Sequence, residues 1–556
     1  MFTRFIPLCL CLTLSLLGGY VSGAEENLDV SAEAVKRDFH EFSTEARRPG
    51  FNVRRHLDAR KDARLEDWKK FAEAGMPEAQ LLLGECHFNG IGVPENREIA
   101  VEWFRKSAAQ ENAMAQWRLG FCYLRGFGVE RNDAESVRWF RRAAERDYAP
   151  AQHELGFSYL TGRGIAQNRE EAVKWYRRAA EQNFAPSQSE LGFCYLRAHG
   201  VSRSDTMAVN WFRQAAEQGL PVAQFELGFS YAHGRGIRRN EAEAVKWFRR
   251  AAEQGHPNAQ NELGKCYFHG TGIPTNKAEA ARWLRRSAED GNVEMQVLLG
   301  RCYLEGIDTS NAKEEAVSWF RKAIEQNNVE AMGLLGKCYF HGWGIPENKE
   351  EAVALFRHAA DQGDAASQYQ LYRCHLGGIV VARDEAEAIR WLRRAADQGY
   401  ASAQATLGRR FLTGAGVPQN EAEAMRWFRR AAVQDNPDAQ YTLGSHFYKG
   451  LSHPEDWDEA IGWFRRAAEQ NHAEGQYRLG WCYLFGHGVR RNEAEAVRWF
   501  RKSAEQGSAR GQHLLGECYA AGWGVPEDRE EAIKWLRKAA EQGIVLAARL
   551  LWEMER

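Results

Sequence analysis

Apolar residues in this chain recur at helical spacing, and one arrangement of apolar and small residues repeats every 36 positions. A Leu-Gly pair marks the repeat, from Leu83-Gly84 to Leu515-Gly516, with no insertion or deletion between copies. One of the thirteen copies has lost the glycine and carries Tyr372 in its place. An unbroken period of this length is typical of a repeat architecture.

Each copy predicts two short amphipathic helices. In the third copy, Ala151, Leu155 and Tyr159 lie one turn apart on one face of a first helix, and a second apolar face follows in residues 172–179. Glycines fill the loop between them, and Asn168 has the place of an N-cap. Two such helices cannot bury their apolar faces alone, so neighbouring copies must stack. The predicted fold class is all-α, a solenoid of 36-residue two-helix repeats.

Two repeated positions are expected in the core. Glycine inside a helix costs about 1 kcal/mol relative to alanine. The recurrence of the glycine in the Leu-Gly pair therefore predicts a close approach by another helix. A tryptophan occupies one position of the second helix, as in Trp139 and Trp175, with Leu355 as the only exception. We expect these rings to be core side chains because of the large area that they bury.

The repeat frame divides the chain into five segments. We expect a signal peptide over residues 1–24, a charged segment, partly helical or disordered, over 25–64, a capping half-repeat over 65–75, thirteen repeats over 76–543, and a capping helix over 544–556.

The first segment predicts export. Arg4 precedes an apolar run from Phe5 to Leu17, and small residues ending at Ala24 stand before an acidic pair. This order is typical of a secretory signal peptide, here cleaved after Ala24. The alternative is an uncleaved membrane anchor, because the apolar run approaches spanning length. We expect a periplasmic or secreted protein with no stable membrane insertion after cleavage.

The repeat motif resembles a known family. The segments AQFELGFSYAHGRGI from Ala223 and EAVKWFRRAAEQG from Glu243 are similar to the Sel-one-like repeat (SLR), a relative of the tetratricopeptide repeat. The resemblance implies a right-handed α/α superhelical solenoid whose first helices line the concave side. It also implies a scaffold or adaptor for proteins or peptides, with no catalytic residues and no cofactor.

Charge argues against some partners. Lys and Arg together number 74, and Asp and Glu number 75. A general nucleic-acid or anionic-membrane binder would carry a basic excess, so we expect no nucleic acid among the partners. We expect a monomer.

Cysteine recurs at one frame position, and stacked helices separate equivalent positions by about 10 Å. A disulfide needs Cα atoms within about 7 Å. We therefore predict buried, unpaired thiols in the chain after residue 24, at these positions: Cys86, Cys122, Cys194, Cys266, Cys302, Cys338, Cys374, Cys482 and Cys518.

Signals for catalysis or metal binding are weak. The runs Cys266-Tyr-Phe-His269 and Cys338-Tyr-Phe-His341 have ligand-like spacing, but the further ligands of a zinc site are missing, so no metal is expected. Ser310 begins a Ser-x-x-Lys match without its usual companion motifs. The alternative function is a cell-envelope hydrolase of the cysteine-rich branch of the family that is sometimes labelled β-lactamase. That branch pairs two cysteines per repeat, and this chain has one.

The positions that the frame leaves free carry the functional hypothesis. The residue after each Leu-Gly pair and the residue four before it share one face of the first helix. Along the chain these positions change from aromatic to basic. The candidate partner-binding residues are Trp117, Phe121, Phe157, Phe193, Phe225, Phe229, Lys265, Arg301, Lys337, Arg373, Arg409, Tyr477 and Trp481.

Two interpretations of this face stay open. If it is concave, it forms a groove with an aromatic half and a basic half. Such a groove would bind an extended protein or peptide segment that carries apolar groups and then acidic groups. Alternatively, the Phe side chains pack between repeats and the cations pair with nearby carboxylates, as Lys265 could with Glu262.

Overall fold

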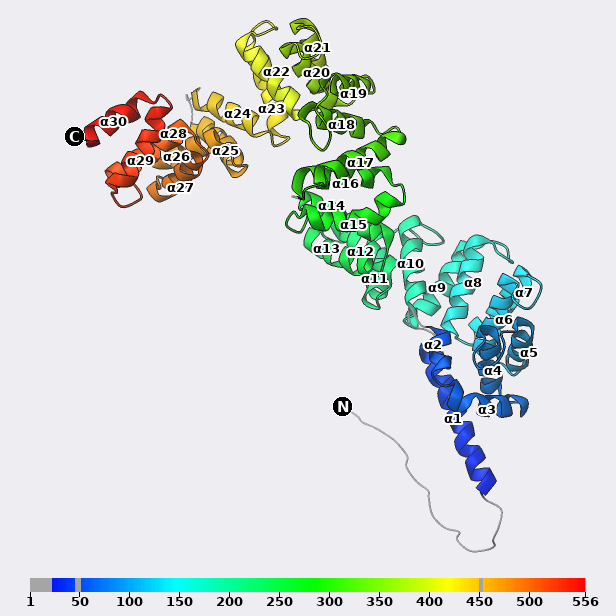
Figure 1. Cartoon of the computed structure of the whole chain (residues 1–556). Coiled ribbons are helices and arrows are strands. Elements are labelled where there is room, and N and C mark those ends of the chain that lie inside the picture. The colour runs from blue at the N-terminus through cyan, green and yellow to red at the C-terminus, as the bar shows by residue number, and fades with distance from the viewer. Residues whose placement is uncertain (1–22, 46–51, 308, 450–453, 556) are drawn as a thin grey trace. The chain divides into compact units, whose positions relative to one another are not determined.

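The computed structural model describes residues 23–45, 52–307, 309–449 and 454–555, and these residues form helices and loops without a strand (Figure 1). The helices pack in consecutive pairs at intervals of 36 residues, which confirms the predicted all-α solenoid. The chain divides into two compact units, Met1–Leu284 and Arg285–Arg556. The boundary falls inside one helix, α15.

In the first unit, up to the boundary in α15, the helices are α1 (Gly23–Glu45), α2 (Val53–Asp58), α3 (Lys61–Glu73), α4 (Pro77–Asn89), α5 (Arg97–Ala109), α6 (Ala113–Arg125), α7 (Asp133–Glu145), α8 (Ala149–Thr161), α9 (Arg169–Glu181), α10 (Ala185–Arg197), α11 (Asp205–Glu217), α12 (Pro221–His233), α13 (Glu241–Glu253), α14 (Pro257–His269) and α15 (Lys277–Glu289).

In the second unit the helices are α16 (Val293–Gly306), α17 (Ala312–Glu325), α18 (Val329–His341), α19 (Lys349–Asp361), α20 (Ala365–Gly377), α21 (Glu385–Asp397), α22 (Ala401–Thr413), α23 (Glu421–Ala432), α24 (Pro437–Lys449), α25 (Pro454–Glu469), α26 (Ala473–Phe485), α27 (Glu493–Glu505), α28 (Ala509–Ala521), α29 (Arg529–Glu541) and α30 (Val545–Glu555).

Local signals set the helix ends. The Asn168 side chain accepts a hydrogen bond from the Glu171 backbone N–H at 3.1 Å and so caps α9, as the sequence predicts. The preceding helix α8 ends at Gly162, whose φ of 77° lies in the left-handed region. Gly164 also has a positive φ, and a Cβ there would overlap the backbone carbonyl of Asp133 in the previous repeat. The loop glycines therefore shape the turn and let it pack on the preceding unit.

The glycine of the Leu-Gly pair makes room for an aromatic ring. A Cβ added at Gly120 would lie 2.7 Å from the ring of Phe140, which is fully buried on the paired helix α7. The same relation holds between Gly84 and Phe104. The expected close approach of a neighbouring helix is confirmed, and the approaching group is a ring.

The tryptophan expectation needs a correction. The fully buried aromatic of the second helix is the residue after the tryptophan, such as Phe140 after Trp139. Trp139 itself is half-buried, and the Arg142 guanidinium lies 4.7 Å from its ring centroid. An exposed ring face is therefore covered by a cation rather than by core packing. In the second unit four of these rings are buried, namely Trp319, Trp391, Trp427 and Trp463.

A glutamine at one position of most first helices joins neighbouring repeats, and the sequence interpretation missed it. Gln152 donates to the Ala144 carbonyl at 3.2 Å and accepts from Gln182 at 2.8 Å. Because a buried amide without partners is costly, this pattern fixes how one repeat stacks on the next. Met332 occupies the equivalent position of another repeat.

The three N-terminal helices precede the first repeat. Helix α1 packs against α3 and α4, and Phe42, Trp68 and Leu82 belong to one buried cluster. Helix α3 begins at Lys61, four residues before the expected half-repeat, and it packs on α4 as a second helix would. The predicted signal peptide lies outside the described residues, except that Gly23 and Ala24 begin α1.

Candidate protein-binding face

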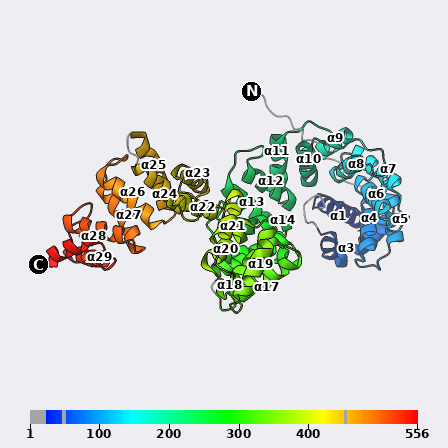
Figure 2. The ribbon, with the colours of Figure 1, turned by 90° about the horizontal axis from the view of Figure 1, so that it is seen from above.

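The candidate residues lie on the even-numbered helices. Figure 2 shows the even-numbered helices from α4 to α14 on the inner side of the arc that the first unit follows. We call the six aromatic candidates of this unit the aromatic row; they are Trp117, Phe121, Phe157, Phe193, Phe225 and Phe229. We call the five cationic candidates the basic row; they are Lys265 in the first unit and Arg301, Lys337, Arg373 and Arg409 in the second.

All six side chains of the aromatic row are half-buried. Ring centroids of Trp117 and Phe121 lie 6.3 Å apart, and those of Phe225 and Phe229 lie 6.1 Å apart. Phe193 meets the fully buried Phe212 edge-on at 5.0 Å. Each ring therefore has one side against the repeat core and a remaining part on the face.

An arginine stands by every phenylalanine that follows a Leu-Gly pair. The guanidinium carbons of Arg125, Arg163, Arg197 and Arg235 lie within cation–π distance of Phe121, Phe157, Phe193 and Phe229, at 5.7, 5.3, 5.1 and 5.1 Å. Such contacts hold a charge over an aromatic surface. Sequence reasoning missed these arginines because two follow their phenylalanine by four residues and two by six, across the helix end.

A carboxyl group stands beside this row on three successive even-numbered helices. Glu154, Glu190 and Glu226 hold one repeat position on α8, α10 and α12. Burial raises the pKa of all three carboxyls, and nearby arginines oppose that shift, with Arg197 acting on both Glu190 and Glu226. The contact regions between neighbouring even-numbered helices, here called seams, thus contain aromatic, cationic and carboxyl groups together.

His153 lies on the same face of α8. Its ring centroid is 5.5 Å from that of Tyr176 and 5.7 Å from that of Phe184, and its Nδ1 is 3.0 Å from the Ser187 hydroxyl. Burial lowers the pKa of His153 to about 4. The imidazole is therefore neutral at pH 7 and acts as an aromatic member of the face.

Carboxylates already pair with part of the basic row. Lys265 lies 3.3 Å from Glu262, as the packing alternative expects. Arg301 pairs with Glu305 at 3.0 Å and with Glu330 of the next repeat at 3.7 Å.

The last basic residues are more open. Arg373 and Arg409 are exposed. Arg409 lies 3.6 Å from Asp438 of the next repeat, and Arg373 donates to Gln370 at 3.3 Å. Exposed ion pairs contribute about 0–1 kcal/mol, so a partner's carboxylate can replace them at small cost.

The last two candidates line a hollow in the second unit. Tyr477 is buried and Trp481 is half-buried. The Trp481 indole donates to the Tyr448 hydroxyl at 3.1 Å. A cavity of about 340 Å³ is lined by Tyr477, Trp481, Arg510, His513, Leu514, Glu517, Ile544 and Leu546.

The cysteines behave as the sequence predicts, since all nine are buried thiols outside any disulfide. Burial raises the pKa of Cys122 to about 12 and that of Cys266 to about 11, so these thiols are poor nucleophiles at neutral pH. Within the described part of the chain, His, Cys, Asp and Glu form no cluster of three or more that could hold a metal ion. In that same part, no helix is both long enough and apolar enough to cross a membrane.

Comparisons with known proteins agree with this architecture. Thirteen consecutive matches to the Sel1 repeat model cover residues 77–544. A protective antigen of uropathogenic Escherichia coli with an SLR fold is 31% identical, with 82% of this chain and 90% of that chain covered and a TM-score of 0.40. A Sel1 repeat protein of Oxalobacter formigenes is 34% identical, with 44% and 96% covered and a TM-score of 0.38.

An immunity protein of Pseudomonas aeruginosa, Pa5087, is also similar in structure, at 19% identity and a TM-score of 0.29, with 40% of this chain and 81% of that chain covered. A search of curated proteins found no match. The repeat matches cover well over half of the sequence and agree with the helix pairs that the structure shows. The chain therefore belongs to the Sel1-repeat family.

Proposed function

We propose that the protein is an exported, non-enzymatic scaffold that binds a segment of another protein along the inner face of its even-numbered helices. Sel1-repeat solenoids are in general binding scaffolds rather than enzymes. The observation that carries the proposal is the aromatic row, whose rings remain half-exposed through four consecutive repeats, with an arginine over each phenylalanine that follows a Leu-Gly pair. Exposed rings in a continuous series are typical of an interaction surface.

The two rows receive different groups in this proposal. Apolar side chains of the partner pack on the aromatic row of the first unit. Acidic side chains pair with the exposed members of the basic row in the second unit, where they replace weak pairs such as Arg409–Asp438. Lys265 and Arg301 contribute less because their present carboxylates lie closer, at 3.3 and 3.0 Å.

Export rests on the N-terminal sequence. The apolar run that begins at Phe5 and the small residues ending at Ala24 support a cleaved signal and a periplasmic or secreted location. N-terminal sequencing of the protein from its own cells tests this, with Glu25 as the expected first residue. A first residue at Met1 would support the anchor instead.

The binding proposal is tested by capture from the cell envelope, followed by identification of the partner and measurement of its affinity. We expect Phe157→Ala with Phe193→Ala to weaken binding about tenfold or more, since truncation of interface aromatics commonly costs about 2 kcal/mol. Arg373→Ala with Arg409→Ala should weaken it less and lower its salt dependence. Ile99→Ala, an exposed substitution on α5, is the matched control. Unchanged affinity in folded aromatic variants would refute the proposed face.

A further inference from the structure

The first repeat already shows how this face buries a helix. Helix α1 packs against α4, and on α4 the positions that correspond to the open face are Leu81, Leu82 and Glu85. Each of these three residues is 0% exposed. In the next repeat the corresponding residues are Trp117, Arg118 and Phe121, and all three are half-buried. The face of α4 therefore accommodates a helix, although burial at these positions does not require one, since Val297 and Leu298 of α16 are buried at the positions of Leu81 and Leu82.

Helix α1 presents an apolar stripe to its site. Among its described side chains, Ala34, Val35, Asp38 and Phe42 are buried, at spacings of three to four residues that place them on one side of a helix. Phe42 is fully buried, and its ring centroid lies 5.7 Å from that of His56, with the two rings tilted. This spacing is the pattern by which an amphipathic helix docks in an apolar groove.

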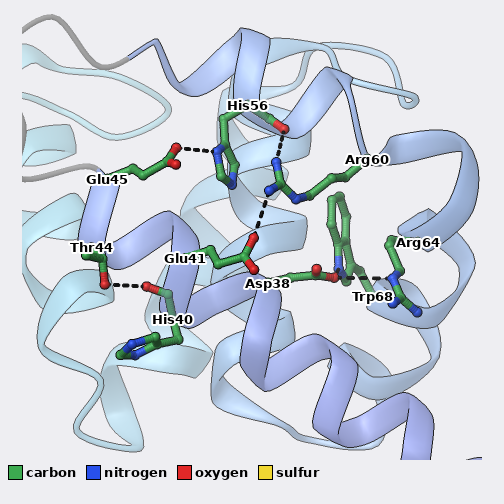
Figure 3. Close-up of polar contacts among 9 residues, drawn as sticks. All are labelled: Asp38, His40, Glu41, Thr44, Glu45, His56, Arg60, Arg64 and Trp68. Atoms are coloured by element: carbon green, nitrogen blue, oxygen red, sulfur yellow. Dashed lines mark hydrogen bonds and ion pairs between the residues drawn. The ribbon is translucent and has the colours of Figure 1, made fainter.

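Cations and hydrogen-bond donors hold the acidic residues of α1, as Figure 3 shows. Asp38 accepts a hydrogen bond from the Trp68 indole at 3.2 Å and lies 3.6 Å from Arg64. Glu41 pairs with Arg60 at 2.8 Å. Glu45 lies 2.8 Å from His56.

The partners of these acidic residues lie on α2, on α3 and between them, whereas on α6, α8, α10 and α12 cations stand on the face itself. These four helices continue the α4 surface with the aromatic row, and Arg125, Arg163, Arg197 and Arg235 stand over its rings. The carboxyls of Glu154, Glu190 and Glu226 face the same seams.

This inference rests on the proposed function. We infer that the partner segment bound by the even-numbered helices α6 to α12 is an acidic amphipathic helix. It docks next to α1, with its apolar side on the face, in the way that α1 packs on α4. Its apolar stripe covers the aromatic row, and its acidic residues pair with the arginines above that row. From the sequence we expect an extended segment in this groove. We propose a helix instead, because the only segment that the described residues place on this face is helical.

The probe is a fluorescent synthetic peptide of residues 25–45, titrated into the full-length mature protein. We expect saturable binding that weakens about tenfold in the Phe157→Ala, Phe193→Ala variant and is retained by Ile99→Ala. Arg163→Gln with Arg197→Gln should reduce both the affinity and its salt dependence. A peptide carrying F42A, or one of scrambled order and equal composition, should bind at least about tenfold more weakly.

Several results would overturn the inference. Equal binding of the scrambled peptide would remove the need for an amphipathic helix. Binding unaffected by the two phenylalanine changes would place the peptide on α4, by displacement of α1. Self-association of the full chain that the peptide abolishes would assign the face to a second copy of the protein. If an identified partner needs the aromatic row but binds as an extended strand, the inference fails while the proposed function stands. If that partner ignores the row, both fail.

Discussion

The same repeat positions differ in their surroundings between the first and the last repeat of the solenoid. On α4, in the first repeat, Leu81 and Glu85 are fully buried, and α1 packs against that helix. On α28, in the last repeat, the corresponding His513 and Glu517 line an open hollow together with Tyr477 and Trp481 of the preceding repeat. Helix α30, at that end, exposes 65% of Leu546 and 55% of Trp552.

This difference teaches that the repeat frame does not decide whether a face position is core or surface. The side chain at the position and what packs on it both contribute, since Val297 and Leu298 of α16 are buried at the positions of Leu81 and Leu82. Where α1 lies, leucine and a buried ion pair between Glu85 and Arg118 fill the site. On the even-numbered helices α6 to α12, no helix of the described residues covers the face. There, aromatic rings with cations over them occupy the corresponding repeat positions.

The largest expected loss of stability is at the N-terminal end, where α1 packs on α4. Phe42→Ala should destabilise the packing of α1 to α4 by about 3–5 kcal/mol, because it removes a fully buried ring. Amide hydrogen exchange of α1 and α4 measures this locally. Phe39→Ala, which truncates a half-buried ring on the same helix, is the control and should cost less. Similar exchange in both variants would contradict the docking of α1.

The next prediction concerns His153, which stands at the repeat position of Leu81. Its folded pKa of about 4 lies below the ordinary value of 6.5, because burial disfavours the charged form. Between these two pH values the unfolded chain binds a proton that the folded chain does not, so stability should fall as the pH is lowered through that window. The loss is up to about 3 kcal/mol, since one pKa unit corresponds to about 1.4 kcal/mol.

Urea unfolding of the wild type and of His153→Gln across this pH range measures the effect. The variant should lack that part of the pH dependence. Parallel curves for the two proteins would show that His153 does not titrate differently on folding, and would place it among the exposed residues of the face.

A smaller effect compares helix packing at the two ends. Gly84→Ala should destabilise by about 1–2 kcal/mol net, since the new methyl overlaps the buried Phe104 ring while alanine favours the helix. Gly516→Ala should cost less because it meets Leu536, a flexible side chain. Gly462→Ala, with nothing within 4 Å, is the control and should stabilise. Thermal denaturation of the three variants ranks them, and equal costs at Gly84 and Gly516 would contradict the role of the ring.

The smallest effect is at the open end. Trp552→Ala should change stability by less than about 1 kcal/mol, because the ring is 55% exposed. Hydrogen exchange of α29 and α30 is the measurement. A loss as large as that of Phe42→Ala would mean that the two ends are capped alike.

Much of the fold could be predicted from the sequence, and the face only in part. The period of 36, the loop glycines, the Asn168 cap and the buried thiols all follow from local chemistry that repeats along the chain. The sites of Arg125 and Arg163 beside their rings did not follow, because one lies in the helix and the other in the loop after it. The pairing of Gln152 with Gln182 was missed because it joins residues 30 positions apart.

By itself the sequence determined the two-helix repeat, its boundaries and the row of aromatic residues that change to basic ones. These features depend on spacing within one helix or one loop, where the positions of residues along the chain fix their positions in space. Only the tertiary structure decided which ring the glycines accommodate, which cations hold carboxylates, and that α1 covers the first repeat. Those contacts join residues far apart in the chain, and no periodicity records which helix will lie on an apolar face.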